Sequence, residues 1–284
     1  MRHASVFSGI GAFEIAAEWM GWTNTFHCEV NPFARKVLQY YWPNSTSYEN
    51  IKQTDFTSQR GKIDVLTGGF PCQPFSSAGK RRGAQDHRYL WPQMLRTVRE
   101  IKPDWVVCEN VAELTRMALE PRLTSVEIET LVEGKDIYRT LESEAIIERI
   151  CQDLEKENYQ VQTFLIPACS TNAPHRRDRT FIIASYTTCE RLSRSEKARD
   201  NQQKKENKRE KPSRFLRPTW ENFPVESPLY RGDDGLSARL SGITFSRFRK
   251  EAIKAYGNAV VPGLAYEIFQ AIQKTEDEYS NKII

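Results

Sequence analysis

The 284-residue sequence predicts an α/β fold, with a mostly parallel sheet and helices on both of its faces. Short apolar runs that are typical of buried strands alternate with amphipathic stretches from Ser5 to about Tyr186. This alternation is the pattern of α/β domains. The composition, 39% hydrophobic and 11% aromatic, is sufficient for a full core of this kind and one small extra domain.

The first strand, turn and helix come at the N-terminus. Residues 5–14 read Ser-Val-Phe-Ser-Gly-Ile-Gly-Ala-Phe-Glu, a short strand and a glycine turn, and a helix follows to Met20. Gly9 and Gly11 allow close approach of a ligand, but without a third glycine the dinucleotide fingerprint is incomplete. A second strand, over 26–30, contains Glu29, whose carboxylate can accept hydrogen bonds from ribose hydroxyls.

The octapeptide over 69–76, Gly-Phe-Pro-Cys-Gln-Pro-Phe-Ser, is the most informative segment. The apolar run over 63–67 predicts a buried strand, which the following glycines end at the carboxyl edge of the sheet. Pro71 and Pro74 fix φ and remove two backbone donors, so the loop presents the Cys72 thiol in a preset geometry. We interpret Cys72 as a nucleophile; the alternative is an inert cysteine buried in a turn.

Two later segments place charged groups beside strands. The strand predicted over 105–111 ends in Glu109 and an amide, for which a helix N-cap or a surface turn is the alternative. Residues 174–184, Pro-His-Arg-Arg-Asp-Arg-Thr-Phe-Ile-Ile-Ala, place basic side chains before an apolar strand. Arg177 and Arg179 point the same way if the strand begins there, whereas most basic clusters are solvated faces.

The C-terminal part predicts a turn and a helix. Residues 256–262 read Tyr-Gly-Asn-Ala-Val-Val-Pro, which predicts the turn. The amphipathic helix that follows carries Leu264, Ile268 and Ile272 on its apolar face.

These five segments, in this order, resemble the cytosine-C5 DNA methyltransferases, and the resemblance covers about two thirds of the chain. It implies a Rossmann-like domain that transfers a methyl group from S-adenosylmethionine to C5 of a flipped-out cytosine in a specific double-stranded DNA site. Cys72 would add covalently to C6. Glu109, with a pKa raised by desolvation, would protonate N3, and Arg179 would stabilise charge near O2. Arg177 would favour the Cys72 thiolate.

The resemblance also assigns binding residues. Those expected at the S-adenosylmethionine pocket are Phe7, Gly9, Ile10, Gly11, Glu29, Val30, Asn50, Ile51, Pro71, Leu90, Asn258 and Val260. Those expected at DNA are Gln73, Ser76, Lys80, Arg81 and Arg82. The three basic side chains can meet phosphates, and the small residues beside them allow the loop to close; a basic surface loop without a partner is the alternative.

The sequence departs from the family pattern in three places. Asn50 stands where an adenine-contacting acid is expected, and Val30 stands where an aromatic residue often follows the ribose-binding acid. Both changes are expected to weaken the cofactor site without abolishing it. Residues 233–242 replace an arginine-rich segment, and the recognition region is short.

Positive charge is concentrated in one segment. The net charge is +4, but residues 189–217 hold eleven Lys or Arg against five acids, so this segment carries +6 and the remainder −2. Because it has almost no apolar residues, we expect a mobile arm or exposed loop that contacts the phosphate backbone. A solvated linker is the alternative.

Three parts are predicted. Residues 1–186 form the catalytic S-adenosylmethionine-binding domain, with a helical insertion at about 115–145. Residues 187–250 form the basic arm and a small irregular target-recognition region, and residues 251–284 return to the catalytic domain.

Several classes of protein are excluded or disfavoured. The six cysteines show no CxxC spacing, so neither a zinc site nor a disulfide framework is expected. No run approaches the eighteen apolar residues of a membrane helix, so we expect a cytoplasmic protein without a membrane partner. We expect a monomer, and a cognate restriction endonuclease is a candidate partner in a bacterial or phage-infected cell.

Two other functions remain as alternatives. One is the same reaction on transfer RNA, since some relatives with small recognition regions act on that substrate. The other is a catalytically silent DNA-binding protein, against which the presence of Cys72, Glu109, Arg177 and Arg179 argues. A comparison of duplex DNA with RNA as substrate distinguishes the first alternative from DNA methylation. A test of cofactor binding distinguishes the second.

Overall fold

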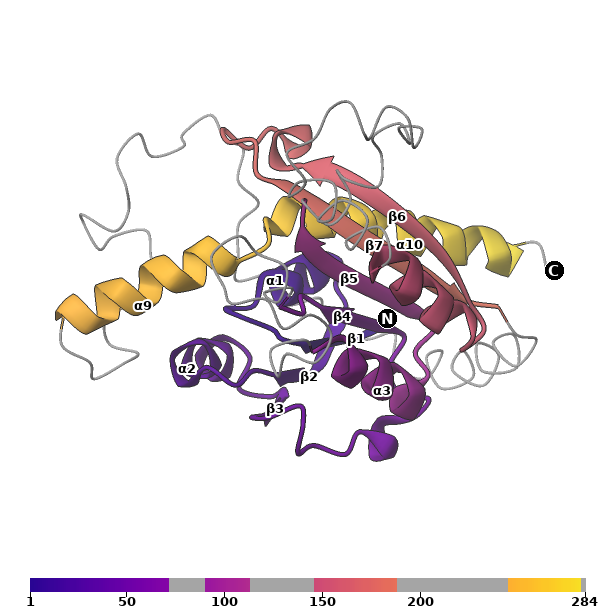
Figure 1. The fold of residues 1–284 in the computed structure, drawn as a ribbon, viewed down its shortest axis with the longest axis horizontal. Helices are drawn as coiled ribbons and strands as arrows, with labels where there is room; N and C mark the ends of the chain where they lie inside the picture. The colour runs from indigo at the N-terminus through magenta and orange to yellow at the C-terminus, as the bar shows by residue number, and fades with distance from the viewer. Residues whose placement is uncertain (72–89, 113–145, 188–244, 282–284) are drawn as a thin grey trace, which may run out of the picture.

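The computed structural model describes residues 1–71, 90–112, 146–187 and 245–281 (Figure 1). The strands are β1 (Arg2–Val6), β2 (Thr23–Cys28), β3 (Thr46–Tyr48), β4 (Val65–Gly68), β5 (Trp105–Val111), β6 (Tyr159–Pro167) and β7 (Asp178–Tyr186). The helices are α1 (Ala12–Trp19), α2 (Pro32–Tyr41), α3 (Trp91–Ile101), a helix over 146–155, α9 (Phe245–Asn258) and α10 (Pro262–Asn281), with 3-10 turns η1 (Thr57–Gln59) and η4 (Ala168–Thr171).

Several predicted features lie outside the described residues. They are Cys72, Gln73, Ser76, Lys80, Arg81 and Arg82, the insertion at 115–145, the basic segment over 189–217 and the segment over 233–242.

The strands form one seven-stranded sheet in the order β3-β2-β1-β4-β5-β7-β6. β1 to β5 pair in parallel, and β7 runs antiparallel to both β5 and β6. The predicted α/β fold with a mostly parallel sheet is therefore confirmed. The chain winds outward from β1 to β3 and then returns to β4 on the other side of β1. Ligands of such sheets bind at this reversal, beyond the carboxyl ends of the strands.

The two faces of the sheet carry separate apolar clusters, because side chains of a strand alternate between faces. In β5, Val106 and Cys108 join the cluster of α3 and the helix over 146–155, whereas Trp105 and Val107 join the cluster of α1 and α10. Figure 1 shows these two helix pairs on opposite sides of the sheet. The prediction of helices on both faces is confirmed.

α10 packs on the same face of the sheet as α1. Leu264, Ile268 and Ile272 are buried, as the amphipathic pattern predicts. Phe269 is fully buried as well, and its ring stacks on Trp22 with centroids 4.7 Å apart. This packing fixes the start of α10, and with it the turn that joins α9 to α10.

Two boundaries differ from the sequence prediction. β2 ends at Cys28 rather than Val30, because the Glu29 side chain is used to hold the loops on either side of it. α9 extends to Asn258, so residues 256–258 end a helix and only the residues after it form the turn. Phe248 of α9 packs edge-on against Phe33 of α2, with 5.6 Å between the ring centroids.

Within the described ranges, no helix is long and apolar enough to cross a membrane.

Candidate active site

Glu29 links the loop after β1 to the loop after β2. Its Oε2 atom accepts a hydrogen bond from the Gly9 backbone N–H at 2.8 Å, and its Oε1 atom accepts from the Asn31 N–H at 2.7 Å. Burial raises the pKa of Glu29, and these backbone donors act against that rise by stabilising the carboxylate. Asn31 in turn caps α2, since its Oδ1 atom accepts from the N–H groups of Phe33 and Ala34.

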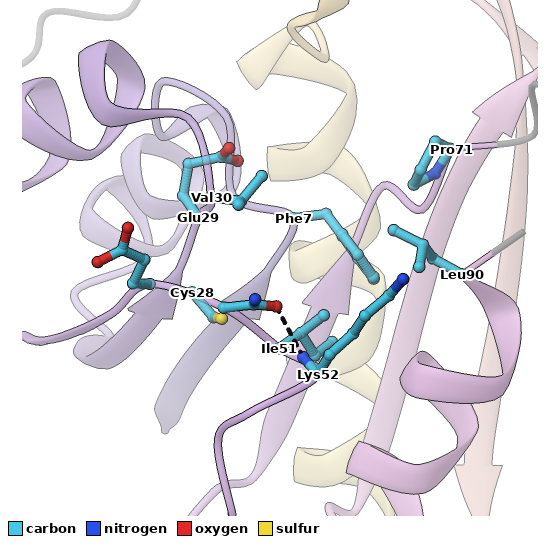
Figure 2. Close-up of a pocket in the computed structure, with 10 residues that line it drawn as sticks. Phe7, Cys28, Glu29, Val30, Ile51, Lys52, Pro71 and Leu90 are labelled. Atoms are coloured by element: carbon cyan, nitrogen blue, oxygen red, sulfur yellow. Dashed lines mark hydrogen bonds between the residues drawn. The ribbon is translucent and has the colours of Figure 1, made fainter. Parts of the chain in front are cut away.

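The backbone of the β1 loop is strained at Phe7. This residue has φ of 54°, in the left-handed region that a bulky side chain seldom adopts. The strained conformation places the ring beside a cavity of about 360 Å³ at the carboxyl edge of the sheet (Figure 2). The lining residues are Phe7, Cys28, Glu29, Val30, Glu49, Asn50, Ile51, Lys52, Pro71 and Leu90.

The shape and chemistry of this first cavity suit a nucleoside. Phe7, Ile51 and Leu90 supply apolar surface (Figure 2). Glu29 supplies one carboxylate at its edge, which is the group that a ribose diol requires. The described part of the chain therefore brings together an apolar slot and the carboxylate of Glu29, at the point where the topology predicts a ligand.

A second cavity, of about 370 Å³, adjoins the first and holds the acid and base groups. The two share Phe7, Glu29, Val30, Pro71 and Leu90 as lining residues. The second cavity adds Gly9, Ile10, Asn31, Ala34, Gly69, Phe70, Glu109, Asn110, Val111, Arg179, Glu251, Lys254, Ala255, Gly257 and Asn258. A molecule in the first cavity would thus lie next to Glu109 and Arg179.

Glu109 and Arg179 form an ion pair in the second cavity. The Arg179 Nε atom lies 2.9 Å from the Glu109 Oε1 atom, and both side chains are largely buried. The pair follows from sheet register, because Val111, two residues after Glu109, lies opposite Arg179 on the antiparallel neighbour β7. Gly69, directly after β4, permits close approach of the backbone to this pair: a Cβ atom there would lie 3.3 Å from Glu109 Oε2.

Burial raises the pKa of Glu109 above its ordinary value. The positive charges of Arg179 and Arg177, and the hydrogen bond from Arg179, act in the opposite direction but do not cancel this effect. The direction agrees with the expectation for a carboxyl group that donates a proton near neutral pH.

Asn110 fixes the start of the cysteine loop. Its Nδ2 atom donates to the carbonyl oxygen of Phe70 at 3.1 Å, inside the protein. Since Phe70 lies two residues before Cys72, this bond ties the loop to the strand that carries Glu109. The sequence pattern places an amide after Glu109 but does not indicate this contact.

Arg177 lies before β7 rather than within it, so it does not share a strand face with Arg179. Its φ is 32°, and its Nη2 atom donates to the carbonyl oxygens of Gly257 at 2.8 Å and Ala259 at 2.7 Å. Arg177 thereby closes the turn between α9 and α10 over the site. The condition for a same-face arrangement of the two arginines is not met, because the strand begins at Asp178.

Two residues predicted at the cofactor pocket, Gly11 and Val260, do not line either cavity and instead pack against neighbouring elements. Gly11 has φ of 95° at the start of α1, where a Cβ atom would lie 2.4 Å from the Trp42 ring. Val260 is buried in the apolar cluster of α1 and α10. The remaining residues of that prediction, where described, line one or both cavities.

Glu251 and Lys254 of α9 line the second cavity and were not predicted from the sequence. Their three-residue spacing on a helix would place them on one face, but no helix was predicted there.

Three of the four described cysteines are poor candidates for a nucleophile. Burial raises the pKa of Cys28 to about 12 and raises the pKa of Cys108 and Cys151 as well. A thiol with a raised pKa carries little thiolate at neutral pH. Cys169 is exposed, on η4.

Comparison with known proteins gives a consistent result. A family model described as C-5 cytosine-specific DNA methylase matches residues 1–227. The type II methyltransferase M.PspPI of a Psychrobacter strain is 34% identical over 189 residues, which cover 64% of this chain and 39% of that protein. The type II methyltransferase M.Eco47II of Escherichia coli is 32% identical over 181 residues, covering 63% and 38%. The chain thus spans less than half the length of these relatives.

Solved structures are similar at lower identity. The DNMT2 of Spodoptera frugiperda aligns with a TM-score of 0.48 and 20% identity, covering 66% of this chain and 50% of that one. The methyltransferase EhMeth of Entamoeba histolytica aligns with a TM-score of 0.47 and 17% identity, covering 66% and 53%.

Proposed function

Because the chain belongs to the C-5 cytosine-specific DNA methylase family, we propose that it transfers a methyl group from S-adenosylmethionine to C5 of a cytosine in a specific double-stranded DNA site. The observation that carries the proposal is the placement of the Glu109–Arg179 pair in a cavity that shares a wall with a nucleoside-shaped cavity. Pro71, directly before Cys72, belongs to that shared wall.

The residues of the first cavity fit S-adenosylmethionine. Glu29 would accept from the ribose hydroxyls with lone pairs that its two backbone donors leave free. Phe7, Ile51 and Leu90 would cover the adenine ring, and Gly9 and Ile10 of the β1 loop would lie nearer the amino acid part. When bound, this cofactor supplies an electrophilic methyl group.

Covalent addition explains what the protein groups would do. Cytosine C5 is a poor nucleophile until conjugation in the ring is broken. The Cys72 thiolate would add to C6, and Glu109 would deliver a proton to N3, so that C5 becomes an enamine carbon. Arg179 would stabilise the charge that develops near O2. After the methyl group is on C5, loss of the C5 proton, cleavage of the sulfur–C6 bond and return of the N3 proton to Glu109 would restore the aromatic ring and the Cys72 thiolate.

The DNA contacts are proposals that follow from the same family membership. A base inside a duplex cannot reach the second cavity, so the target nucleotide would swing out, at a cost of a few kcal/mol. Gln73, Ser76, Lys80, Arg81 and Arg82 of the cysteine loop and the basic segment over 189–217 would supply compensating contacts. A restriction endonuclease is a candidate partner, since type II methyltransferases are among the relatives.

Label transfer tests the proposed function. The purified protein is incubated with tritiated S-adenosylmethionine and either mixed-sequence duplex DNA or transfer RNA, beside the Cys72→Ala variant. We expect label in DNA as 5-methylcytosine and none with the variant. Label in RNA alone, or in neither substrate, would contradict the proposal.

A further inference from the structure

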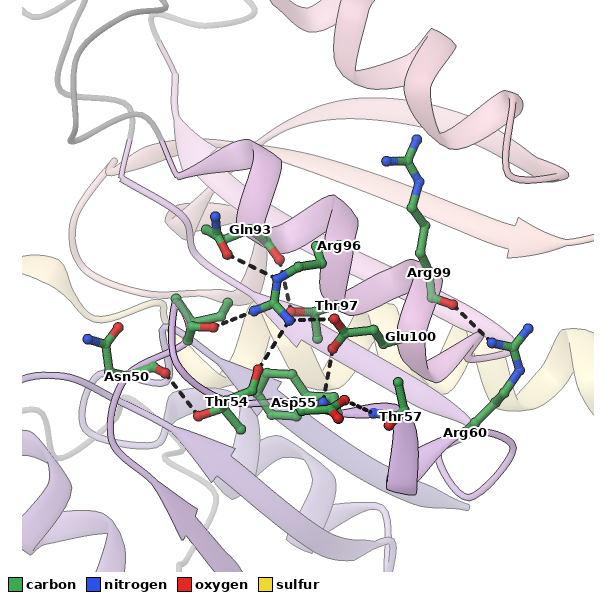
Figure 3. Close-up of polar contacts among 12 residues, drawn as sticks. Asn50, Thr54, Asp55, Thr57, Arg60, Gln93, Arg96, Thr97, Arg99 and Glu100 are labelled. Atoms are coloured by element: carbon green, nitrogen blue, oxygen red, sulfur yellow. Dashed lines mark hydrogen bonds and ion pairs between the residues drawn. The ribbon is translucent and has the colours of Figure 1, made fainter.

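Arg96 of α3 lies behind one wall of the first cavity. It binds the chain segment over 50–56, whose first residues form that wall (Figure 3). Its Nη2 group donates to the carbonyl oxygen of Ile51, and its Nη1 group donates to that of Thr54 at 3.1 Å. Both acceptors are more than forty residues earlier in the chain, so these bonds tie the segment to a different element.

Glu100 and Gln93 hold the guanidinium in place. Arg96 Nη1 lies 2.5 Å from Glu100 Oε1, one helical turn along α3, and Arg96 Nε donates to Gln93 Oε1 at 3.1 Å. The other Glu100 oxygen, Oε2, accepts from the Phe56 backbone N–H at 2.9 Å. Arg96 and Glu100 therefore bind the same segment with groups of opposite polarity. The rigid fork of arginine suits this arrangement, which a single ammonium group could not reproduce.

The segment needs such support because it is not part of the sheet. β3 ends at Tyr48, and residues 50–56 form a turn and an irregular stretch. Its local bonds close the first turn, where the Asn50 carbonyl oxygen accepts from Thr54 Oγ1 at 2.9 Å, and near the far end Asp55 Oδ1 accepts from the Thr57 N–H at 2.8 Å. At its far end Phe56 is fully buried against Phe26. Between these ends, the carbonyls bound by Arg96 set where Asn50 and Ile51 face the cavity.

We propose that Arg96, together with Glu100, is a positioning residue that sets the Asn50–Ile51 wall of the cofactor cavity. Arg96 is not a lining residue of that cavity, so it acts through the backbone that it holds. The inference rests on the proposed function for the identity of the ligand. It predicts that loss of the fork weakens binding of any ligand that contains the adenosine part of the cofactor.

Arg99 offers a matched control on the same helix. Its Nε atom lies 2.7 Å from Glu157 Oε1, and its side chain is about half exposed. Figure 3 shows its side chain directed away from the segment that Arg96 holds. The Arg99→Gln variant therefore removes a cationic ion-pair partner from α3 without touching residues 50–56.

Calorimetry with two ligands tests the inference. S-adenosylhomocysteine and 5′-methylthioadenosine share the adenosine part, but only the first contains the amino acid part. We expect Arg96→Gln to weaken both by the same factor, about tenfold, while Arg99→Gln binds as the wild type does. Arg96→Lys keeps the charge beside Glu100 but lacks the fork, and should recover only part of the affinity.

Hydrogen exchange gives a readout without ligand or activity. Amides over 52–56 should exchange faster in Arg96→Gln and Glu100→Gln than in the wild type and Arg99→Gln. Three results together would overturn the inference. Arg96→Gln would bind both ligands like the wild type, its amides over 52–56 would exchange at the wild-type rate, and its Tm would fall no further than that of Arg99→Gln. Failure of the wild type to bind S-adenosylhomocysteine would instead overturn the proposed function, and the exchange rates would still decide whether Arg96 holds the segment.

Discussion

Arg179 Nε lies 2.9 Å from Glu109 Oε1, so the acid of the site and its cationic neighbour are set on adjacent antiparallel strands. The pair balances two opposing effects on one pKa. Burial raises the pKa of Glu109, and Arg179 lowers it from the level that burial alone would set. The net direction, a raised pKa, favours the protonated form of the Glu109 carboxyl group.

Glu109→Gln should lower kcat for methyl transfer by about 10²–10⁴-fold, because an amide keeps the shape of the side chain but cannot transfer a proton. Single-turnover methylation at saturating DNA and cofactor measures this. Binding of S-adenosylhomocysteine should be unchanged, which separates a lost proton from a damaged cavity. A variant that methylates at the wild-type rate would exclude Glu109 as the proton donor.

Arg179→Gln should shift the alkaline limb of the pH–rate profile to higher pH. The proposed mechanism needs protonated Glu109, so the rate should fall as pH rises through the pKa of that group. Because Arg179 lowers this pKa, its removal raises it, and the protonated form persists to higher pH. The measurement is kcat/KM over a pH series. An alkaline limb that stays in place or moves to lower pH would show that Arg179 does not act on Glu109.

Arg177→Gln should reduce the rate of methyl transfer about tenfold or more, since two carbonyl oxygens in the α9–α10 turn lose a charged donor. Arg176→Gln is the matched control, because the Arg176 side chain is 79% exposed and its ion-pair partner among the described residues is Asp178 rather than the α9–α10 turn. Equal rates for the two variants would mean that closure of the turn by Arg177 has no part in the reaction.

Glu14→Gln should change how stability depends on pH. Glu14 is buried, with Oε1 accepting from Ser5 Oγ and Oε2 without a hydrogen-bond partner among the described residues. Burial raises its pKa to about 7 from 4.5, opposed by the bond from Ser5 and assisted by the negative charge of Glu29. The stabilising effect of the bound proton is therefore complete below pH 4.5 and is lost as pH rises through about 7.

Urea unfolding of the wild type and Glu14→Gln at pH 5 and pH 8 measures this effect. Between pH 5 and pH 8, the unfolding free energy of the wild type should fall by on the order of 2 kcal/mol relative to that of Glu14→Gln. Glu18→Gln, on the same helix but only partly buried, is the control. A difference that is constant with pH would show that Glu14 titrates alike in both states.

Phe269→Ala should destabilise the protein by about 4 kcal/mol, since a fully buried aromatic ring is removed from its contacts with Trp22 and Phe13. Thermal unfolding checks the prediction, with the exposed neighbour Gln270→Ala as control, for which the change should be within about 0.5 kcal/mol. Similar Tm values for both variants would mean that α10 does not depend on this ring.

Local patterns in the sequence were enough to predict the sheet and the loops at its edge. The strand over 105–111 was located to the residue because its apolar run is buried on both faces. The β1 loop and Glu29 were predicted because glycines after a strand allow a ligand close to the backbone, and an acid after the next strand can bind a ribose.

Contacts between distant segments could not be predicted in the same way. The bonds from Arg177 to Gly257 and Ala259 span about eighty residues, and those from Arg96 to the 50–56 segment span more than forty. Periodicity gives the face on which a side chain lies but not the partner that it meets. An arginine in an amphipathic helix is normally interpreted as a solvent-facing residue, so the sequence did not indicate the contacts of Arg96.

The most direct test of the central claim is a covalent trap. Duplex DNA that carries 5-fluorocytosine at the target position is incubated with the protein and S-adenosylmethionine, and the products are analysed by intact mass and peptide mapping. Addition at C6 and methyl transfer to C5 can proceed, but the C5 substituent cannot leave as a proton, so the sulfur–C6 bond persists. We predict a protein–DNA adduct that contains the added methyl group and maps to Cys72. Methylation of ordinary cytosine in the same duplex without any adduct, or an adduct at another residue, would contradict the account.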